Sequence, residues 1–515
     1  MATPPTSLLA RAWGALKLAR SAVRLSRAED ERVAAQARAY LAQSMGELRG
    51  LPQKIGQILS MSDAPTAKQF DALTGESEPL PFATIAAILA EEWGQPWSQV
   101  LSEAETRGHA ASLGQVHRGT LPGGRSVAVK VQYPGIGRSV ESDLKLLGWL
   151  TLPVGGLGRG FNLRAYRDEI LRDFKEELDY LREAEHQRRF REQVRAWAGV
   201  VVPEVIPALT TPRVLVSAWE DGETLEQVAS HWPAAERKAA GRMLLHCVLN
   251  ALFRDGFVQG DLHAGNFRFR RSARGIDLVL YDFGCMFAPP RAARLAFLRL
   301  IDMTEANRDG DPYPLFLKLG FDPAYLEPLA HKLPALSRVL FEPFMLEGEY
   351  GVDDWKLGAR VSGILGDDRW NFRVAGPADL ILLMRVFHGL LHALRRLDAP
   401  VSWKAIMRPI RDDLRAEAQA LALPAAPQAS RSFARMAKYL LIQVSENGMT
   451  KVRVTSPLHV VDDLEGSMDA ETLAKVRRRG IDLARIVAGV RASGYAPQDV
   501  FTLNEGPRQI RVWLQ

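Results

Sequence analysis

The feature that most constrains the fold of this 515-residue chain is the stretch VQGDLHAGNFRFRRSARGIDLVLYDFGCM, residues 258–286. Asp261 and Asn266 stand five positions apart in DLHAGN, and Asp282 opens a D-F-G tripeptide further on. The residues between Asn266 and Asp282 predict two short strands. The first, 267–270, alternates apolar and basic residues, the second, 276–281, is nearly all apolar, and a turn at 272–275 joins them. We expect this hairpin to bring the three polar side chains together.

The spacing of these residues suits phosphoryl transfer. That reaction needs metal ions on the phosphates and a carboxylate near the attacking oxygen, and D-x-x-x-x-N followed by D-F-G is the order found in protein kinases. Asp282 would hold one Mg²⁺, Asn266 a second, and Asp261 would face the acceptor. A D-F-G alone is often a buried acid beside a turn glycine, so the interpretation depends on the combination.

A second motif lies upstream, in TRGHAASLGQVHRGTLPGGRSVAVK. Against the kinase pattern G-x-G-x-x-G-x-V, His109 and Ala111 replace the first two glycines, whereas Gly114 and Val116 match. Lys130 follows in VAVK, on a strand reached through a P-G-G turn. It would hold the α- and β-phosphates. The alanine should make the loop stiffer than a glycine loop, because each Cβ narrows the freedom of the backbone.

The charged segment FKEELDYLREAEHQRRF, residues 174–190, predicts a helix that could carry a partner for Lys130. Glu177 and Glu183 are the candidates. They are nearly two turns apart and about 120° off a common face, so at most one of them is the partner, and the sequence leaves open which. The following apolar strand ends at 218–222, where a hinge between two lobes would lie.

Composition excludes several classes of protein. Hydrophobic residues at 47% and charged residues at 24% are those of an ordinary folded protein, and a net charge of +6 is mild for this length. Zinc-finger spacing and RNP-like motifs are absent from the sequence, which argues against nucleic acid as a partner. Two distant cysteines indicate a reducing compartment. No uncharged apolar run reaches the roughly 18–20 residues of a membrane helix, so we expect a cytoplasmic protein, at most peripheral on a membrane.

Length and motif order suggest four regions: an N-terminal helical extension (1–80), a small lobe (81–220), a helical lobe with the D-F-G (221–420), and an α+β appendage (430–515). Residues 7–27 are basic and amphipathic, compatible with an anionic membrane surface, a transit peptide or a solvated helix. The apolar rhythm of the two lobes predicts helices at 82–93, 234–255, 289–306 and 379–398. In the appendage we expect a helix from residue 432, a strand at 450–455, a long helix at 469–491 and a closing hairpin.

Taken together, the chain resembles the AarF/UbiB family of atypical kinase-like proteins, over about residues 48–400. The resemblance rests on K-x-G-Q at Lys54 to Gln57, an alanine loop at Ala110, Ala111 and Ser112, the strand lysine Lys130, E-x-D at Glu177 and Asp179, and the set Asp261, Asn266 and Asp282. The chain departs from the family where it has Gln259 in place of the usual histidine of His-Ala-Asp. It also has one alanine fewer in the loop and lacks the C-terminal membrane segments of bacterial UbiB.

The resemblance implies an α+β, bilobal protein-kinase-like fold that binds ATP with Mg²⁺, in which the K-x-G-Q helix folds over the site. The residues expected at ATP are Lys54, Gln57, Ala110, Ala111, Ser112, Gly114, Val116, Lys130, Glu177 and Glu183. It further implies an atypical kinase or ATPase linked to isoprenoid lipid, such as ubiquinone. Two alternatives remain: a non-catalytic nucleotide switch that holds a lipid or protein, and a small-molecule phosphotransferase of the aminoglycoside type.

Overall fold

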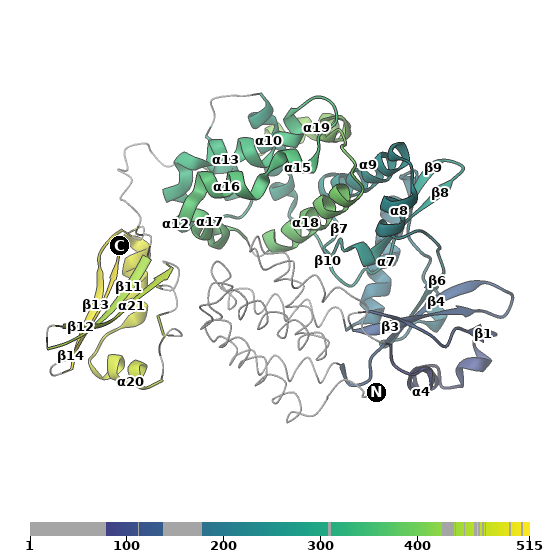
Figure 1. Cartoon of the computed structure of the whole chain (residues 1–515), viewed down its shortest axis with the longest axis horizontal. Coiled ribbons are helices and arrows are strands. Elements are labelled where there is room, and N and C mark those ends of the chain that lie inside the picture. Colours follow the sequence, from purple (N-terminus) through teal and green to yellow (C-terminus); the bar gives the residue numbers. More distant parts are fainter. Residues whose placement is uncertain are drawn as a thin grey trace.

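The computed structural model describes residues 79–136 except 112, 178–306, and 311–424 except 378. It also describes 437–515 with gaps at 438, 448, 458–460, 462–463, 466–467, 469, 494–495 and 506–507. Within these ranges a small sheet is followed by a mainly helical region and then by a C-terminal four-stranded sheet (Figure 1). The expected α+β architecture, with a small sheet-containing lobe before a helical one, is confirmed. The basic segment 7–27 and K-x-G-Q lie outside the described residues.

The first sheet is antiparallel, in the order β1-β3-β4-β6, with β2 paired to β3. Its strands are β1 (Glu103–Ala104), β2 (His109–Ala110), β3 (Gly114–Thr120), β4 (Ser126–Gln132) and β6 (Val214–Ala218). The P-G-G turn joins β3 to β4 as predicted, and the register places Val116 opposite Lys130 and Lys130 opposite Leu215. Residues directly opposite one another share a face, so these three lie on one side of the sheet.

The other side of this sheet is covered by α4 (Phe82–Trp93), which has the predicted bounds. The alternation of side chains along β4 determines which of its residues face α4, because successive strand residues point to opposite faces of the sheet. Val127, Val129 and Val131 are buried against Ile85 and its apolar neighbours on α4. Ala128, Lys130 and Gln132 therefore face away from α4, and packing of this helix leaves the lysine side of the sheet to the site.

The segment 258–287 forms the predicted hairpin and a short ladder. Strand β8 (Phe267–Ser272) pairs with β9 (Gly275–Leu280), and β9 also pairs in parallel with β5 (Val200–Val201). Strand β7 (Val258–Gln259) pairs with β10 (Met286–Phe287), which closes the chain around the D-F-G. The two motifs of residues 258–286 thus lie side by side, because strands on both sides of them are hydrogen bonded.

The helical region packs around one apolar core. Its helices are α8 (Leu225–His231), α9 (Ala234–Asn250), α10 (Arg291–Glu305), α11 (Tyr313–Lys318), α12 (Pro323–Leu326), α13 (Leu333–Leu340), α14 (Glu342–Met345), α15 (Val352–Trp355), α16 (Leu357–Leu365), α17 (Arg369–Ala375), α18 (Leu380–Arg396) and α19 (Trp403–Ala420). The helices expected near 234, 289 and 379 are confirmed, although a π-helical turn at Ala251–Asp255 ends the first.

The C-terminal sheet has the order β12-β11-β14-β13. It consists of β11 (Tyr439–Glu446), β12 (Met449–Pro457), β13 (Asp499–Glu505) and β14 (Arg508–Leu514), so the strand near 450 and the closing hairpin are confirmed. The single helix expected at 469–491 is wrong: α20 (Ala470–Arg478) and α21 (Leu483–Ala492) are separate. Gly480 has φ +71°, a left-handed conformation that ends helices, and Asp482 accepts from the N–H of Arg485 in the next one.

Among the described residues, no helix combines the length and the apolar character that crossing a membrane would require.

Candidate active site

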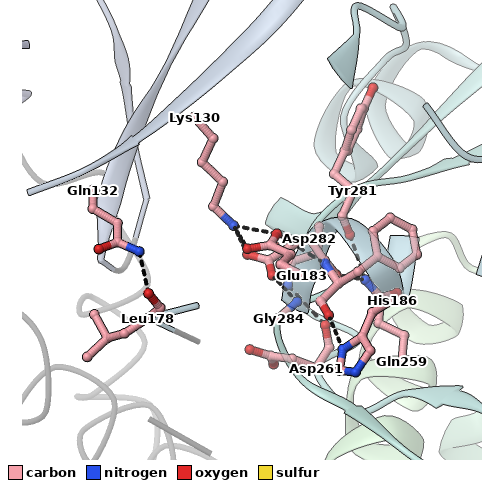
Figure 2. A network of polar contacts seen from close by, with 12 residues as sticks. Lys130, Gln132, Leu178, Glu183, His186, Gln259, Asp261, Tyr281, Asp282 and Gly284 are labelled. Atoms are coloured by element: carbon pink, nitrogen blue, oxygen red, sulfur yellow. Dashed lines mark hydrogen bonds and ion pairs between the residues drawn. The ribbon is translucent and has the colours of Figure 1, made fainter. Parts of the chain in front are cut away.

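The centre of the candidate site is a three-residue contact between the sheet, one helix and the D-F-G. Lys130 Nζ lies 2.7 Å and 2.9 Å from the two carboxylate oxygens of Glu183 and 3.4 Å from Asp282 Oδ2. Figure 2 shows the ammonium group directed at both carboxylates, which come from different elements. Lys130 and Asp282, 152 positions apart in the chain, are thus direct neighbours.

The helix that carries Glu183 is α7 (Tyr180–Gln193). Hydrogen bonds hold both its first turn and the residues that lead into it. The Asp179 side chain accepts hydrogen bonds from the N–H groups of Leu181 and Arg182, an N-cap that satisfies two unpaired donors of the first turn. Gln132, at the end of β4, donates to the carbonyl of Leu178 at 2.6 Å (Figure 2). The strand that carries Lys130 therefore also anchors the entry to the helix that carries Glu183.

Burial governs the charges of this group. The side chain of Glu183 is 1% exposed, and burial, with the like charge of Asp282, raises the pKa of its carboxyl to about 7 although Lys130 opposes this. Burial alone would lower the pKa of Lys130, but the carboxylates of Asp282 and Glu183 outweigh it and raise the pKa well above its usual range. The lysine stays protonated, and when Glu183 is ionised the two carboxylates together carry one negative charge more than the lysine balances. A cation near Asp282 would balance that excess.

The backbone of the D-F-G is held by three side chains. Asp282 has φ +56°, an uncommon conformation for a residue other than glycine. Gln259 donates to the carbonyls of Tyr281 and Asp282, both at 2.6 Å. Glu183 accepts from the N–H of Phe283 at 3.3 Å, and His186, one turn later on α7, contacts the carbonyl of the same residue at 3.1 Å. These three side chains therefore hold the strained backbone conformation of Asp282 in place.

The loop between β7 and β8 carries the two other polar residues of the motif. The side-chain amide of Asn266 donates to the carbonyl of Asp261 at 3.0 Å, and the N–H of Tyr281 donates to the carbonyl of Asn266 at 2.8 Å. Asn266 therefore links the loop to the residue before Asp282. The carboxylate of Asp261 lies 3.0 Å from the guanidinium of Arg385, on α18.

The predicted phosphate loop lies between β2 and β3. Ala110 is the last residue of β2, and the N–H of Ala111 donates to the carbonyl of Gly114 at 2.8 Å. A Cβ on Gly114 would lie 2.3 Å from the carbonyl oxygen of Val131, so this glycine permits a close approach of β3 to β4. Val116 follows on the same face as Lys130.

Lys54, Gln57, Ser112 and Glu177 lie outside the described residues. Of the two glutamates proposed as partners of Lys130, Glu183 makes the contact.

The described donors suit Mg²⁺ better than a metal that needs a complete protein cage. In the described part of the chain, no three His, Cys, Asp or Glu side chains gather as a metal site. Mg²⁺ usually takes one or two carboxylates together with substrate phosphates and water. Asp282, whose side chain is 33% exposed, and the amide oxygen of Asn266 are of the required type.

Sequence reasoning missed three residues that contact the site. Gln259 was noted only as a departure from the family pattern, although its position two residues before Asp261 was a usable signal. His186 stands three positions after Glu183, the spacing of one helix face, and could have been found once Glu183 was chosen. Arg385 lies more than one hundred positions from Asp261 in an apolar helix, and no local pattern indicates its contact.

Three comparisons bear on this site. A family model described as the ABC1 atypical kinase-like domain matches residues 72–310. The atypical kinase coq-8, mitochondrial, of Caenorhabditis elegans is 32% identical over 385 residues, which cover 71% of this chain and 50% of that protein. The atypical kinase COQ8B, mitochondrial, of Rattus norvegicus is 29% identical over 401 residues, which cover 75% of this chain and 74% of that protein. The chain thus spans half the length of the nematode relative.

A solved structure is also similar. The complex of Rv3197 with erythromycin, from Mycobacterium tuberculosis, aligns with a TM-score of 0.52 and 28% sequence identity. The alignment covers 73% of this chain and 95% of that one.

Proposed function

The chain belongs to the ABC1 (AarF/UbiB) family of atypical kinase-like proteins, and on that premise we propose that it binds Mg-ATP and transfers or hydrolyses the γ-phosphate. The observation that carries the proposal is the contact of Lys130 with both Glu183 and Asp282. A strand lysine paired with a helix glutamate, beside a D-F-G aspartate, is the arrangement that positions triphosphate for phosphoryl transfer.

Each residue has a separate task in this proposal. Lys130, kept protonated, holds the α- and β-phosphates, and Glu183 fixes its direction. Asp282 and Asn266 would hold Mg²⁺, which when bound neutralises charge on the phosphate oxygens. The loop of Ala110, Ala111 and Gly114 would cover the phosphates, with Val116 on the side of the base. Lys54, Gln57 and Ser112 remain proposed contacts.

Asp261 faces the nucleophile. The oxygen of water or of an acceptor hydroxyl forms a bond to the γ-phosphorus while the bond to the β–γ bridging oxygen breaks, and ADP leaves with that electron pair. The proton of the nucleophile passes to the carboxylate of Asp261. The family resemblance extends the proposal to isoprenoid lipid, ubiquinone included, as the partner, and the basic segment 7–27 extends it to an anionic membrane surface.

Two measurements on the purified chain test the proposal. Mg-ATP should raise the melting temperature of the wild-type protein, and Asp282→Asn should abolish the part of this shift that depends on Mg²⁺. Phosphate release from ATP, with and without anionic liposomes, then separates an enzyme from a nucleotide-binding switch. An unchanged shift in Asp282→Asn would count against the assigned metal site, and binding without any phosphate release would favour the switch.

A further inference from the structure

Helix α18 reaches the loop that carries Asp261 through an arginine. Arg385 Nη2 lies 3.0 Å from Asp261 Oδ2, and the side chains are 7% and 20% exposed. Taking a guanidinium out of water is costly unless an opposite charge and hydrogen bonds compensate. A nearly buried arginine therefore binds Asp261 as part of the fold. Its planar fork also fixes the direction of a carboxylate more closely than a flexible ammonium would.

A second contact of α18 lies one helical turn further on. A Cβ on Gly389 would sit 1.9 Å from the carbonyl oxygen of Leu262, the residue after Asp261. No side chain fits in that space, so the helix backbone lies directly against the loop backbone. Residues four apart lie on the same face of a helix. Arg385 and Gly389 thus contact consecutive loop residues, one through its side chain and the other through its backbone.

We infer that Arg385 is a positioning residue for Asp261, and this inference rests on the proposed function. The guanidinium holds one carboxylate oxygen, so that the carboxylate is already oriented when the nucleophile arrives. Asn266 fixes the backbone of the same residue through a hydrogen bond to its carbonyl. Arg385 lies beyond residues 72–310, which match the family model, so the helical region outside that match contributes to the site.

The test compares full-length variants by phosphate release from Mg-ATP, with kcat and KM measured separately. Arg385→Met should lower kcat roughly 10- to 100-fold, part of the full contribution of a general base, while KM for Mg-ATP stays within about threefold. Arg385→Lys keeps the charge and loses the planar fork, so kcat should fall only about three- to tenfold. Arg411→Met, which removes a comparable Arg–Asp pair with Asp302, is the matched control and should leave kcat within about threefold.

The outcomes separate the two proposals. If the wild-type protein releases no phosphate, the catalytic part of the proposed function fails and the inference fails with it. If the wild-type is active and Arg385→Met keeps its kcat, only the inference is overturned, and the ion pair is purely structural. Should Arg385→Met not fold, Arg385→Lys decides: wild-type kcat in that variant overturns the positioning role, and a fall with unchanged KM supports it.

Discussion

Gln259 donates a hydrogen bond of 2.6 Å to the carbonyl oxygen of Asp282, the residue with φ +56° in the D-F-G. Its amide nitrogen also donates to the carbonyl of Tyr281 at 2.6 Å. By the family resemblance, a histidine is expected at this position. In this chain the glutamine side chain supplies the hydrogen-bond donors to the carbonyls of Tyr281 and Asp282. A glutamine amide has no charge change near neutral pH, so this support for Asp282 does not depend on protonation.

Gln259→Leu should therefore weaken both stability and metal binding. The substitution leaves the carbonyl groups of Tyr281 and Asp282 without this donor. An unsatisfied buried acceptor costs at most about 1–3 kcal/mol of unfolding free energy. We expect urea unfolding to show a loss in this range and the Mg-ATP melting shift to fall below half of the wild-type value. Gln187→Leu is the control, because Gln187 is also buried and donates to the carbonyl of Pro203 at 2.8 Å, away from Asp282. Equal Mg-ATP shifts in the two variants would contradict the role of Gln259.

Glu183 predicts a pH-dependent stability in the absence of nucleotide. Its folded-state pKa of about 7 lies above the ordinary value of 4.5, because of burial and Asp282. The folded protein thus holds this proton more tightly than the unfolded chain, and stability falls as pH rises from about 4.5 to about 7. Glu183→Gln removes this titration. As the pH rises from about 4.5 to about 7, the unfolding free energy of the variant relative to the wild type should therefore increase, by at most about 3 kcal/mol.

Urea unfolding at pH 5 and pH 8, without Mg²⁺ or ATP, measures this difference. Glu185→Gln is the control on the same helix, since Glu185 is exposed and pairs at the surface with Arg188. Parallel pH dependence in Glu183→Gln and the wild type would show that the carboxyl does not titrate in this range.

Local pattern was sufficient for the elements that carry the site. Helix α4 has its predicted bounds, and the hairpin of β8 and β9 follows the apolar alternation of the sequence. The contact of Lys130 with Asp282 was expected only from the order of kinase motifs, because no local property of a lysine in a V-A-V-K strand indicates a partner 152 positions away. The choice of Glu183 over Glu177 needed the position of the helix N-cap at Asp179.

The remaining differences between the predicted and the observed structure come from tertiary contacts and from the residues that end helices. Arg385 meets Asp261 because Gly389 lets α18 lie against the loop, a packing relationship with no sequence period. The strand β11 was missed because we expected a helix from residue 432, although Y-L-L-I-Q-V is rich in the β-branched and apolar residues of strands. The break between α20 and α21 was readable in principle, since a glycine followed two residues later by an aspartate is a stop and a start signal.

Gly114 should not tolerate a side chain. A Cβ there would lie 2.3 Å from the carbonyl oxygen of Val131 and 2.9 Å from the hydroxyl of Tyr180, and the first neighbour is backbone that cannot move alone. Gly114→Ala should cost about 1–3 kcal/mol of unfolding free energy and separate β3 from β4 at the phosphate loop, with weaker Mg-ATP binding. Gly363→Ala, in α16 with nothing within 4 Å of the added Cβ, should instead raise stability by up to about 1 kcal/mol. Thermal melts of the two variants should shift in opposite directions.

Arg411 joins helices α10 and α19 through two carboxylates, and its removal should destabilise the helical region. Its Nε lies 2.6 Å from Asp302 Oδ1, and it also contacts Glu305, which pairs with Lys404 at 2.9 Å. Burial raises the pKa of Asp302 although Arg411 opposes this, so loss of the arginine leaves a partly buried carboxylate poorly compensated. Arg411→Met should lower the unfolding free energy by about 1–3 kcal/mol at pH 7, less than for a fully buried pair because the site is partly exposed.

The size of this loss should depend on pH. Protonation of Asp302 removes the uncompensated charge, so the difference between Arg411→Met and the wild type should shrink as pH falls from 7 to 4. Arg415→Met is the matched control on the same helix: Arg415 pairs with Asp412 at the surface, and its removal should cost less than about 0.5 kcal/mol at either pH. A pH-independent loss in Arg411→Met would indicate that lost packing of the side chain, and not its charge, sets the stability of this contact.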